Sequence, residues 1–345
     1  MTAVLTPPPT APAGRFGNLL RAEAHRFLAR RFIAVLLAVA VVGWLAALVI
    51  SLLSFESPTP ERLAEARQQQ QEQIQLSEEG RQQCLADPTR PAGAPAEEWC
   101  GPPVSADQLP LSLFLRPAPF SLADDGPTGA VAVAALSAAL AFLVGGTFVG
   151  AEWSSRSMVA LLFWETRRPR VMGAKLLVTA AASVVLGLLM QAAWLGLATL
   201  LHSVAGDGVA PPDGFWSELL GTQGRGVLLT VFAGLLGFGL TNLLRNTGAA
   251  TGVAFVYLVV GENAVRALHP AWQPWLLTND AAALVLPHGL TLYTPDATTL
   301  DASGNPSYGM VEYLLPNGQA AVFLTVVTAV VVGVGVLLFS RRDLH

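Results

Sequence analysis

EWSSRSMVALLFWETRRPRVMGAK, residues 152–175, is a charged segment between two long apolar runs. Its five cationic side chains are Arg156, Arg167, Arg168, Arg170 and Lys175. A short basic segment beside apolar runs is typical of a loop that joins two membrane-spanning helices. The same segment contains an apolar stretch from Met158 to Trp164, which such a loop does not need. The sequence therefore predicts a membrane protein in which this loop has a second role.

Six apolar runs are long enough to cross a bilayer. A hydrocarbon core of about 30 Å needs about 20 helical residues, because each residue advances a helix by about 1.5 Å. The chain is 52% hydrophobic and 13% charged, whereas soluble domains contain about 25% charged residues. We therefore expect an all-α polytopic membrane protein with six transmembrane helices. The expected spans are residues 32–53, 129–151, 176–201, 226–244, 249–268 and 320–339.

The segments between these runs differ in composition. Residues 1–14 are rich in Pro and Ala, and we expect them to be disordered. In residues 15–31, apolar side chains recur at helical spacing beside arginines, which predicts an amphipathic interfacial helix. A plain extension of the first span is the alternative. The remaining segments are a domain at 54–128, the loop at 152–175, a short loop at 202–225, a loop with short helices at 269–318 and a tail at 340–345.

Charge is distributed unevenly between these segments. Six spans place both termini on one side, which then holds 13 of the 20 basic residues. That side holds few acids, namely Glu23, Glu152, Glu165 and Asp343. Basic residues in short loops favour the cytoplasmic side of a membrane. We therefore expect both termini and the 152–175 loop to be cytoplasmic, and the 54–128 domain to be extracytoplasmic.

Cys84 and Cys100 are the chain's 2 cysteines, and both lie in the 54–128 segment. In an oxidising extracytoplasmic space they would form an intrachain disulfide. Two free thiols are the alternative. The five histidines form no HExxH pattern, and the chain has no GxSxG motif. We therefore expect no metal-ligating, catalytic or cofactor-binding residues.

Several local features follow the second run in a fixed order. Glu152 comes first, then the turn at 155–158, the apolar stretch at 159–164, the basic Arg167-Arg168-Pro169-Arg170 run and Lys175. The chain closes with FSRRDL at 339–344. With six spans in this order, the chain resembles the ABC-2 type permeases of ABC transporters, in the form whose ATPase is a separate polypeptide. It departs from compact members in its long 54–128 and 269–318 segments.

The resemblance implies a permease subunit of an ABC exporter, located in a bacterial plasma membrane. No Walker A pattern occurs in the chain, so the subunit is expected not to be an enzyme. A partner subunit would bind ATP and Mg. The implied partners are two copies of a soluble ABC ATPase and a second copy of this permease or a similar one, within the lipid bilayer and without nucleic acid. The alternative is a membrane-anchored sensor or scaffold whose extracytoplasmic domain binds a ligand without transport.

By the same resemblance, the 152–175 loop would dock the ATPase and couple its closure to the spans. The expected coupling residues are Glu152, Arg156, Met158, Leu161, Leu162, Trp164, Arg167, Arg168 and Arg170. Apolar, aromatic and Arg side chains are favoured at protein interfaces. We expect Pro169 to end a helix in this loop. A basic loop that only contacts lipid headgroups is the alternative.

Polar residues inside or near the spans are Gln191, Asn242, Glu262, Asn263 and Arg266. Ionisable groups at membrane depth are usually paired or functional. Glu262 and Arg266 are four residues apart, so a helix would bring them together as an ion pair. Gln191 and Asn242 fit either hydrogen bonds between helices or contacts with a substrate.

Overall fold

The computed structural model describes residues 16–87, 99–155, 157, 167–300 and 306–341. The chain forms two compact units. Unit 1 comprises residues 1–42, 127–194 and 216–345. Unit 2 comprises residues 43–126 and 195–215.

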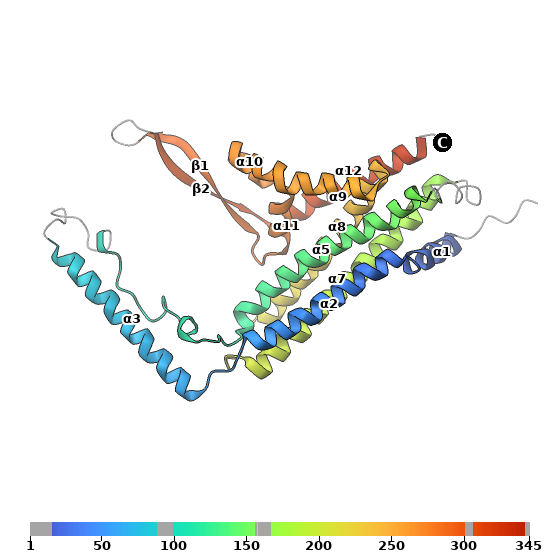
Figure 1. Ribbon diagram of the computed structural model, residues 1–345. Coiled ribbons are helices and arrows are strands. Elements are labelled where there is room, and N and C mark those ends of the chain that lie inside the picture. The colour runs from blue at the N-terminus through green and yellow to red at the C-terminus, as the bar shows by residue number, and fades with distance from the viewer. Residues whose placement is uncertain (1–15, 88–98, 156, 158–166, 301–305, 342–345) are drawn as a thin grey trace, which may run out of the picture. The chain divides into compact units, whose positions relative to one another are not determined.

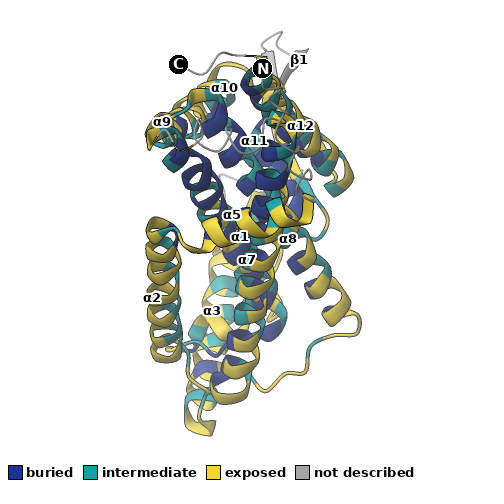
Figure 2. Cartoon of the chain, turned by 90° about the vertical axis from the view of Figure 1, so that its right-hand side faces the viewer, coloured by how far each residue is buried: buried dark blue, intermediate teal, exposed yellow. Residues whose placement is uncertain are grey.

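Within the described residues, six helices are long and apolar enough to span a membrane (Figure 1). They are α2 (Arg31–Ser54), α5 (Leu122–Ser154), α7 (Arg168–Ala205), α8 (Phe215–Leu244), the continuous helix Thr247–Leu268 and α12 (Asn317–Arg341). These helices define the chain as a multi-pass membrane protein by their length and composition. Figure 2 shows how little of α2 is buried, as expected for a helix that faces lipid.

Several helices extend beyond the spans expected from the sequence. α7 begins at Arg168, so Pro169 lies in the first turn of this helix. The loop helix that Pro169 was expected to end lies outside the described residues. Proline suits the first turn because a helix leaves the N–H groups there without intrahelical partners. The loop expected at 202–225 is also shorter, because α7 continues to Ala205 and α8 begins at Phe215.

The amphipathic segment forms its own helix, α1 (Phe16–Leu28). It ends before α2 begins, so the segment is not a plain extension of the first span. Phe27 of α1 is buried against Phe148 of α5, with 5.1 Å between the ring centroids. This contact holds α1 against the membrane-spanning helices of unit 1.

Glycines allow α5 and α8 to approach closely. A Cβ atom added to Gly237 would lie 2.1 Å from the carbonyl oxygen of Phe142, and one added to Gly145 would lie 2.2 Å from that of Gly234. Both distances are shorter than any side chain tolerates. Small residues are favoured where helices pack in membranes, because the apolar solvent supplies little driving force and van der Waals contact must replace it.

The helix Thr247–Leu268 consists of α9 (Thr247–Val256), a π-helical turn, η2 (Tyr257–Gly261), and α10 (Glu262–Leu268). It is followed by two short helices, η3 (Pro270–Trp275) and α11 (Leu277–Val285). Short helices were expected in this region, but the hairpin after them was not. Strands β1 (Leu290–Leu300) and β2 (Pro306–Leu315) pair antiparallel from Leu290↔Leu315 onward. Their alternating Leu, Thr, Tyr and Val residues favour strands.

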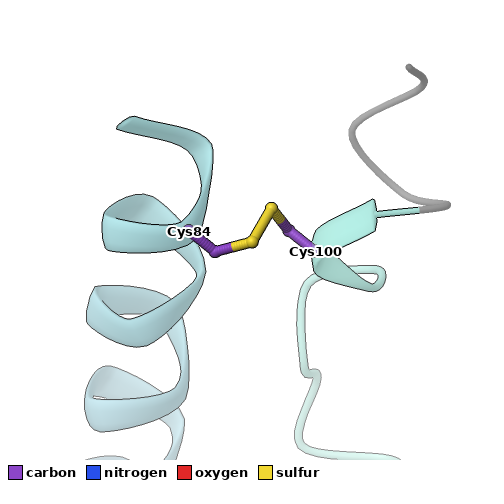
Figure 3. Close-up of a disulfide and its surroundings, with 2 residues drawn as sticks. All are labelled: Cys84 and Cys100. Atoms are coloured by element: carbon purple, nitrogen blue, oxygen red, sulfur yellow. A yellow bond between two sulfur atoms is a disulfide. The ribbon is translucent and has the colours of Figure 1, made fainter. Parts of the chain in front are cut away.

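Unit 2 contains the long helix α3 (Pro60–Ala86), which has Thr59 as its N-cap, and the short helix η1 (Leu111–Phe114). Cys84 of α3 and Cys100 form the expected disulfide (Figure 3). The Gln70 side chain also donates a hydrogen bond to the Leu109 carbonyl oxygen over 2.7 Å. These two ties hold the returning chain beside α3.

Candidate functional site

A buried cluster of charged side chains joins three helices of unit 1. Lys175 of α7 donates to Glu23 of α1 over 2.5 Å and to Glu152 of α5 over 2.8 Å. The side chains of Lys175 and Glu23 are fully buried, and that of Glu152 is nearly so. We call Glu23, Arg26, Arg30, Glu152 and Lys175 the charge cluster.

Two arginines complete the cluster toward solvent. Arg26 pairs with Glu23 over 2.7 Å, and Arg30 pairs with Glu152 over 2.9 Å. Both arginines are partly exposed, with 45% and 24% of their side-chain surfaces accessible. The cluster thus contains two carboxylates and three cations, and each buried charge has an opposite charge in contact.

Burial makes this cluster a structural constraint. Moving a charge out of water costs several kcal/mol, so removing one partner of a buried pair is about 3–5 kcal/mol destabilising. The Lys175 ammonium also lies 4.9 Å from the centroid of the Phe148 ring, a favourable cation–π contact. α1, α5 and α7 are therefore held together where α5 ends and α7 begins.

The cluster brackets the loop that was expected to dock a partner. Glu152 lies at the end of α5, and Lys175 lies in the second turn of α7. The expected contact residues Arg156, Met158, Leu161, Leu162 and Trp164 lie outside the described residues. The hydroxyl groups of Ser154 and Ser155 both donate to the Ala151 carbonyl oxygen, so they bond to the last turn of α5.

The basic run after the loop lies at the start of α7. Arg167 is exposed, whereas Arg168 and Arg170 are half-buried. Arg168 donates to the carbonyl oxygens of Phe339 and Ser340, each over 3.4 Å. The start of α7 is thereby tied to the end of α12.

Trp153, next to Glu152, connects further helices. Its indole N–H donates to the Asn242 side-chain oxygen of α8 over 3.3 Å, and its ring packs edge-on against Phe339 of α12. The guanidinium of Arg245 lies 4.7 Å from the centroid of the Trp153 ring. Arg245 adopts a left-handed backbone conformation, with φ of 54°, in the turn between α8 and α9. One end of the bundle is therefore cross-linked around residues 152 and 153.

Gln191 and Asn263, two more of the predicted polar residues, form hydrogen bonds within the protein. Gln191 of α7 donates to the Ala130 carbonyl oxygen of α5 over 3.1 Å and accepts, through its own carbonyl, a hydrogen bond from Gln223 of α8. Asn263 donates to the Val259 carbonyl oxygen of its own helix. For Gln191 and Asn242, the contacts in the structure are hydrogen bonds between helices.

Glu262 and Arg266 form the expected ion pair over 3.3 Å. The pair also reaches α11, because Glu262 accepts from the backbone N–H of Thr278 over 3.1 Å and from its hydroxyl. Arg266 additionally contacts Asn279 over 3.2 Å. These groups therefore join α10 to α11 and form a second polar site in unit 1.

The sequence-based reasoning missed Glu23 and Trp153. Glu23 stands among the apolar positions of the amphipathic helix, four residues after Leu19 and four before Phe27. An acid on the apolar face of a helix is a signal for a buried cation on a neighbouring element. Trp153 gave no such signal, since its partners come from distant parts of the chain.

The fold defines the class of this protein as a mainly helical, multi-pass membrane protein with an intrachain disulfide. No protein-family model matches the chain, and no curated protein matches it in sequence.

Proposed function

We propose that the protein is the membrane-spanning permease subunit of an ABC exporter, of the ABC-2 type. The observation that supports this most strongly is the Glu152–Lys175 pair. It joins the two helices that flank the basic loop, and the same lysine binds Glu23 of α1. A force applied to such a loop by a docked ATPase would move α1, α5 and α7 together.

The proposed cycle needs a partner for its chemistry. The chain has no Walker A motif, so two soluble ATPase subunits would bind ATP and Mg and dock at the loop. The permease would act with a second copy of itself or with a similar permease. Closure of the ATPases would pull the loop, and the charge cluster would pass the displacement to the spans. The substrate would leave outward.

The orientation of the chain belongs to this proposal. With the termini and the loop in the cytoplasm of a bacterium, Arg26, Arg30 and Lys175 of the charge cluster would lie at the cytoplasmic end of the helices. This agrees with the preference of basic residues near spans for the cytoplasmic side. The disulfide in unit 2 would then lie in an oxidising space, where such bonds persist. The distribution of basic residues and the disulfide therefore support the same orientation independently.

A sensor or scaffold is the second candidate, and unit 2 favours it. This unit is compact by itself and has a long helix tied by a disulfide to the returning chain. In a sensor, this unit would be the part that binds the ligand. It would need no ATPase, which separates the two functions experimentally.

The test is to co-express the full chain with a soluble ABC ATPase encoded beside its gene and to purify the complex in lipid nanodiscs. An ABC permease should retain the ATPase and change its rate of ATP hydrolysis. The Leu161→Asp variant should lower ATPase retention by about tenfold or more, because it places a charge in the apolar stretch.

The matched control is Leu76→Asp on α3, which exchanges an exposed leucine of unit 2 for the same charge. It should leave retention unchanged. If no ABC ATPase binds, or if Leu161→Asp binds it as well as the unaltered chain does, the permease proposal is wrong. Ligand-dependent protection of α3 from hydrogen exchange, without any ATPase, would favour the sensor.

A further inference from the structure

Asp280 is a buried carboxyl group near the start of α11. The residue is fully buried, and neither of its carboxylate oxygens has a hydrogen-bond partner within the described residues. A buried ionised carboxylate without a partner is costly, so such groups keep a proton or bind a cation.

A second carboxyl group, that of Glu262, is also fully buried, and its negative charge makes ionisation of Asp280 less favourable. Glu262 has its own partners, namely Arg266 and both the backbone N–H and the hydroxyl of Thr278. It accepts from one backbone N–H, that of Thr278, in the first turn of α11, where a helix leaves such groups without intrahelical partners. Within the described residues, the site thus holds two carboxyl groups and one cation, Arg266, which pairs with Glu262.

In the part of the chain that the structure describes, the other polar groups around α11 supply no second cation to Asp280. Arg266 is shared between Glu262, Thr278 and Asn279, the last two at 2.5 and 3.2 Å. Arg225 of α8 contacts the far end of α11, at the Val285 carbonyl oxygen. α12 contributes the neutral Asn317, whose amide donates to three carbonyl oxygens at that same far end. The Tyr257 hydroxyl lies near Glu262 and adds no positive charge.

We propose that Asp280 and Glu262 form a proton-binding site that fastens α11 to α10 when Asp280 is protonated and loosens this contact when both carboxyl groups are ionised. The ligand is a proton taken by the Asp280 carboxylate. The inference does not depend on the proposed transport function. The proposed site responds to pH and lies where the chain turns from α10, which ends at Leu268, into α11, which begins at Leu277.

The electrostatics set the direction of the response. Burial, and then the Glu262 carboxylate, raise the pKa of Asp280 from an ordinary value of 3.8 to about 7. The folded protein therefore binds this proton more tightly than the unfolded chain does. Its stability falls as the pH rises from about 4 to about 7 and is constant above that range with respect to this group.

The first measurement is infrared difference spectroscopy of the full chain in nanodiscs. The carbonyl band of a protonated carboxyl group should disappear as the pH passes about 7, and the Asp280→Asn variant should lack this titrating band. Asp280→Glu should retain a titrating band. Asp213→Asn, at an exposed position, is the matched control and should leave the titration unchanged.

The second measurement is hydrogen–deuterium exchange of the α11 amides, corrected for the intrinsic effect of pH. Exchange in the unaltered chain should increase above the titration midpoint, whereas Asp280→Asn should show no pH-dependent change. If Asp280 is already ionised near pH 5, or if α11 is equally protected on both sides of the midpoint, the proposal is wrong. A midpoint that moves with Na⁺ or K⁺ concentration would overturn it in favour of a metal-cation site.

Discussion

Lys175 is the residue on which the charge cluster depends. Its ammonium group contacts carboxylates from two other helices, and all three side chains are buried. When that cation is removed, Glu23 keeps its pair with Arg26 and Glu152 keeps its pair with Arg30, but both lose their fully buried partner. The partly exposed Arg26 and Arg30 do not occupy its position.

We predict that Lys175→Met lowers the stability of the purified protein by about 3–5 kcal/mol, because it leaves two buried carboxylates without their shared cation. Thermal stability in detergent, followed by size-exclusion chromatography, measures the loss. Adding Glu23→Gln and Glu152→Gln should recover part of it, since the buried side chains at these positions are then neutral.

The control is Arg62→Met, which breaks a solvent-exposed ion pair with Glu56. Such pairs contribute about 0–1 kcal/mol, so the midpoint should change little. Equal losses for Lys175→Met and Arg62→Met would contradict the assignment of the cluster as a buried constraint.

At the scale of elements, close contact between α5 and α8 depends on the absence of side chains. The backbone of one helix occupies the space where the other would carry a Cβ atom. Apolar length alone predicts that these helices exist, whereas the glycines decide how near they come. The composition of residues 129–151 indicated close packing but did not identify the partner helix.

Gly237→Ala should destabilise the protein by about 1–3 kcal/mol, because its Cβ would lie 2.1 Å from the Phe142 carbonyl oxygen and the helices would have to separate. Gly333→Ala in α12 is the matched control, since an added Cβ there meets nothing within 4 Å. Thermal unfolding of both variants in the same detergent gives the comparison. A harmless Gly237→Ala would mean that α5 and α8 are farther apart.

The disulfide constrains a second element, helix α3. Cys84 and Cys100 are 16 residues apart, and closing a loop of about this length contributes about 3 kcal/mol in the chain-entropy model. Replacing both cysteines with serine should increase hydrogen exchange in the last turns of α3, near Cys84. Exchange in α8 of unit 1 serves as the internal reference and should not change. Unaltered exchange in α3 would show that the helix does not need this bond.

The whole molecule presents two long apolar helices with little protein cover. α2 has 6% of its most apolar window buried, and the helix Thr247–Leu268 has 11%. A chain with such surfaces needs lipid or another subunit around it. The orientation proposed for the six helices in the bilayer rests on the charges of their connections.

Single-cysteine labelling tests this orientation. The two natural cysteines form the disulfide, so a maleimide should not label the unaltered chain in the absence of reductant. A membrane-impermeant maleimide should label Ser105→Cys on intact cells, but should label Ser157→Cys only after permeabilisation. Both serines are exposed. The opposite pattern would reverse the orientation and, with it, the proposed docking of a cytoplasmic ATPase.

Several features were accessible from the sequence because they are local. The apolar runs, the Glu262–Arg266 spacing and the pairing of Cys84 with Cys100 depend on composition or on short distances along the chain. α7 begins before the expected span at 176, because its first turns carry the polar run from Arg168 to Lys175 and proline is suited to the first turn of a helix. The hairpin at 290–315 was missed because its strands follow apolar segments that favour helices.

What the sequence determined by itself was the membrane class, because the length and apolarity of six runs leave few alternatives. The amphipathic face of α1, the basic loop and the disulfide pairing could also be inferred from it. Only the tertiary structure brought Glu23 to Lys175, Trp153 to Asn242 and Glu262 to Thr278, two residues before Asp280. These contacts depend on how the helices pack, and the periodicity of the sequence does not specify that packing. They bring polar residues that are distant in the sequence together in one site.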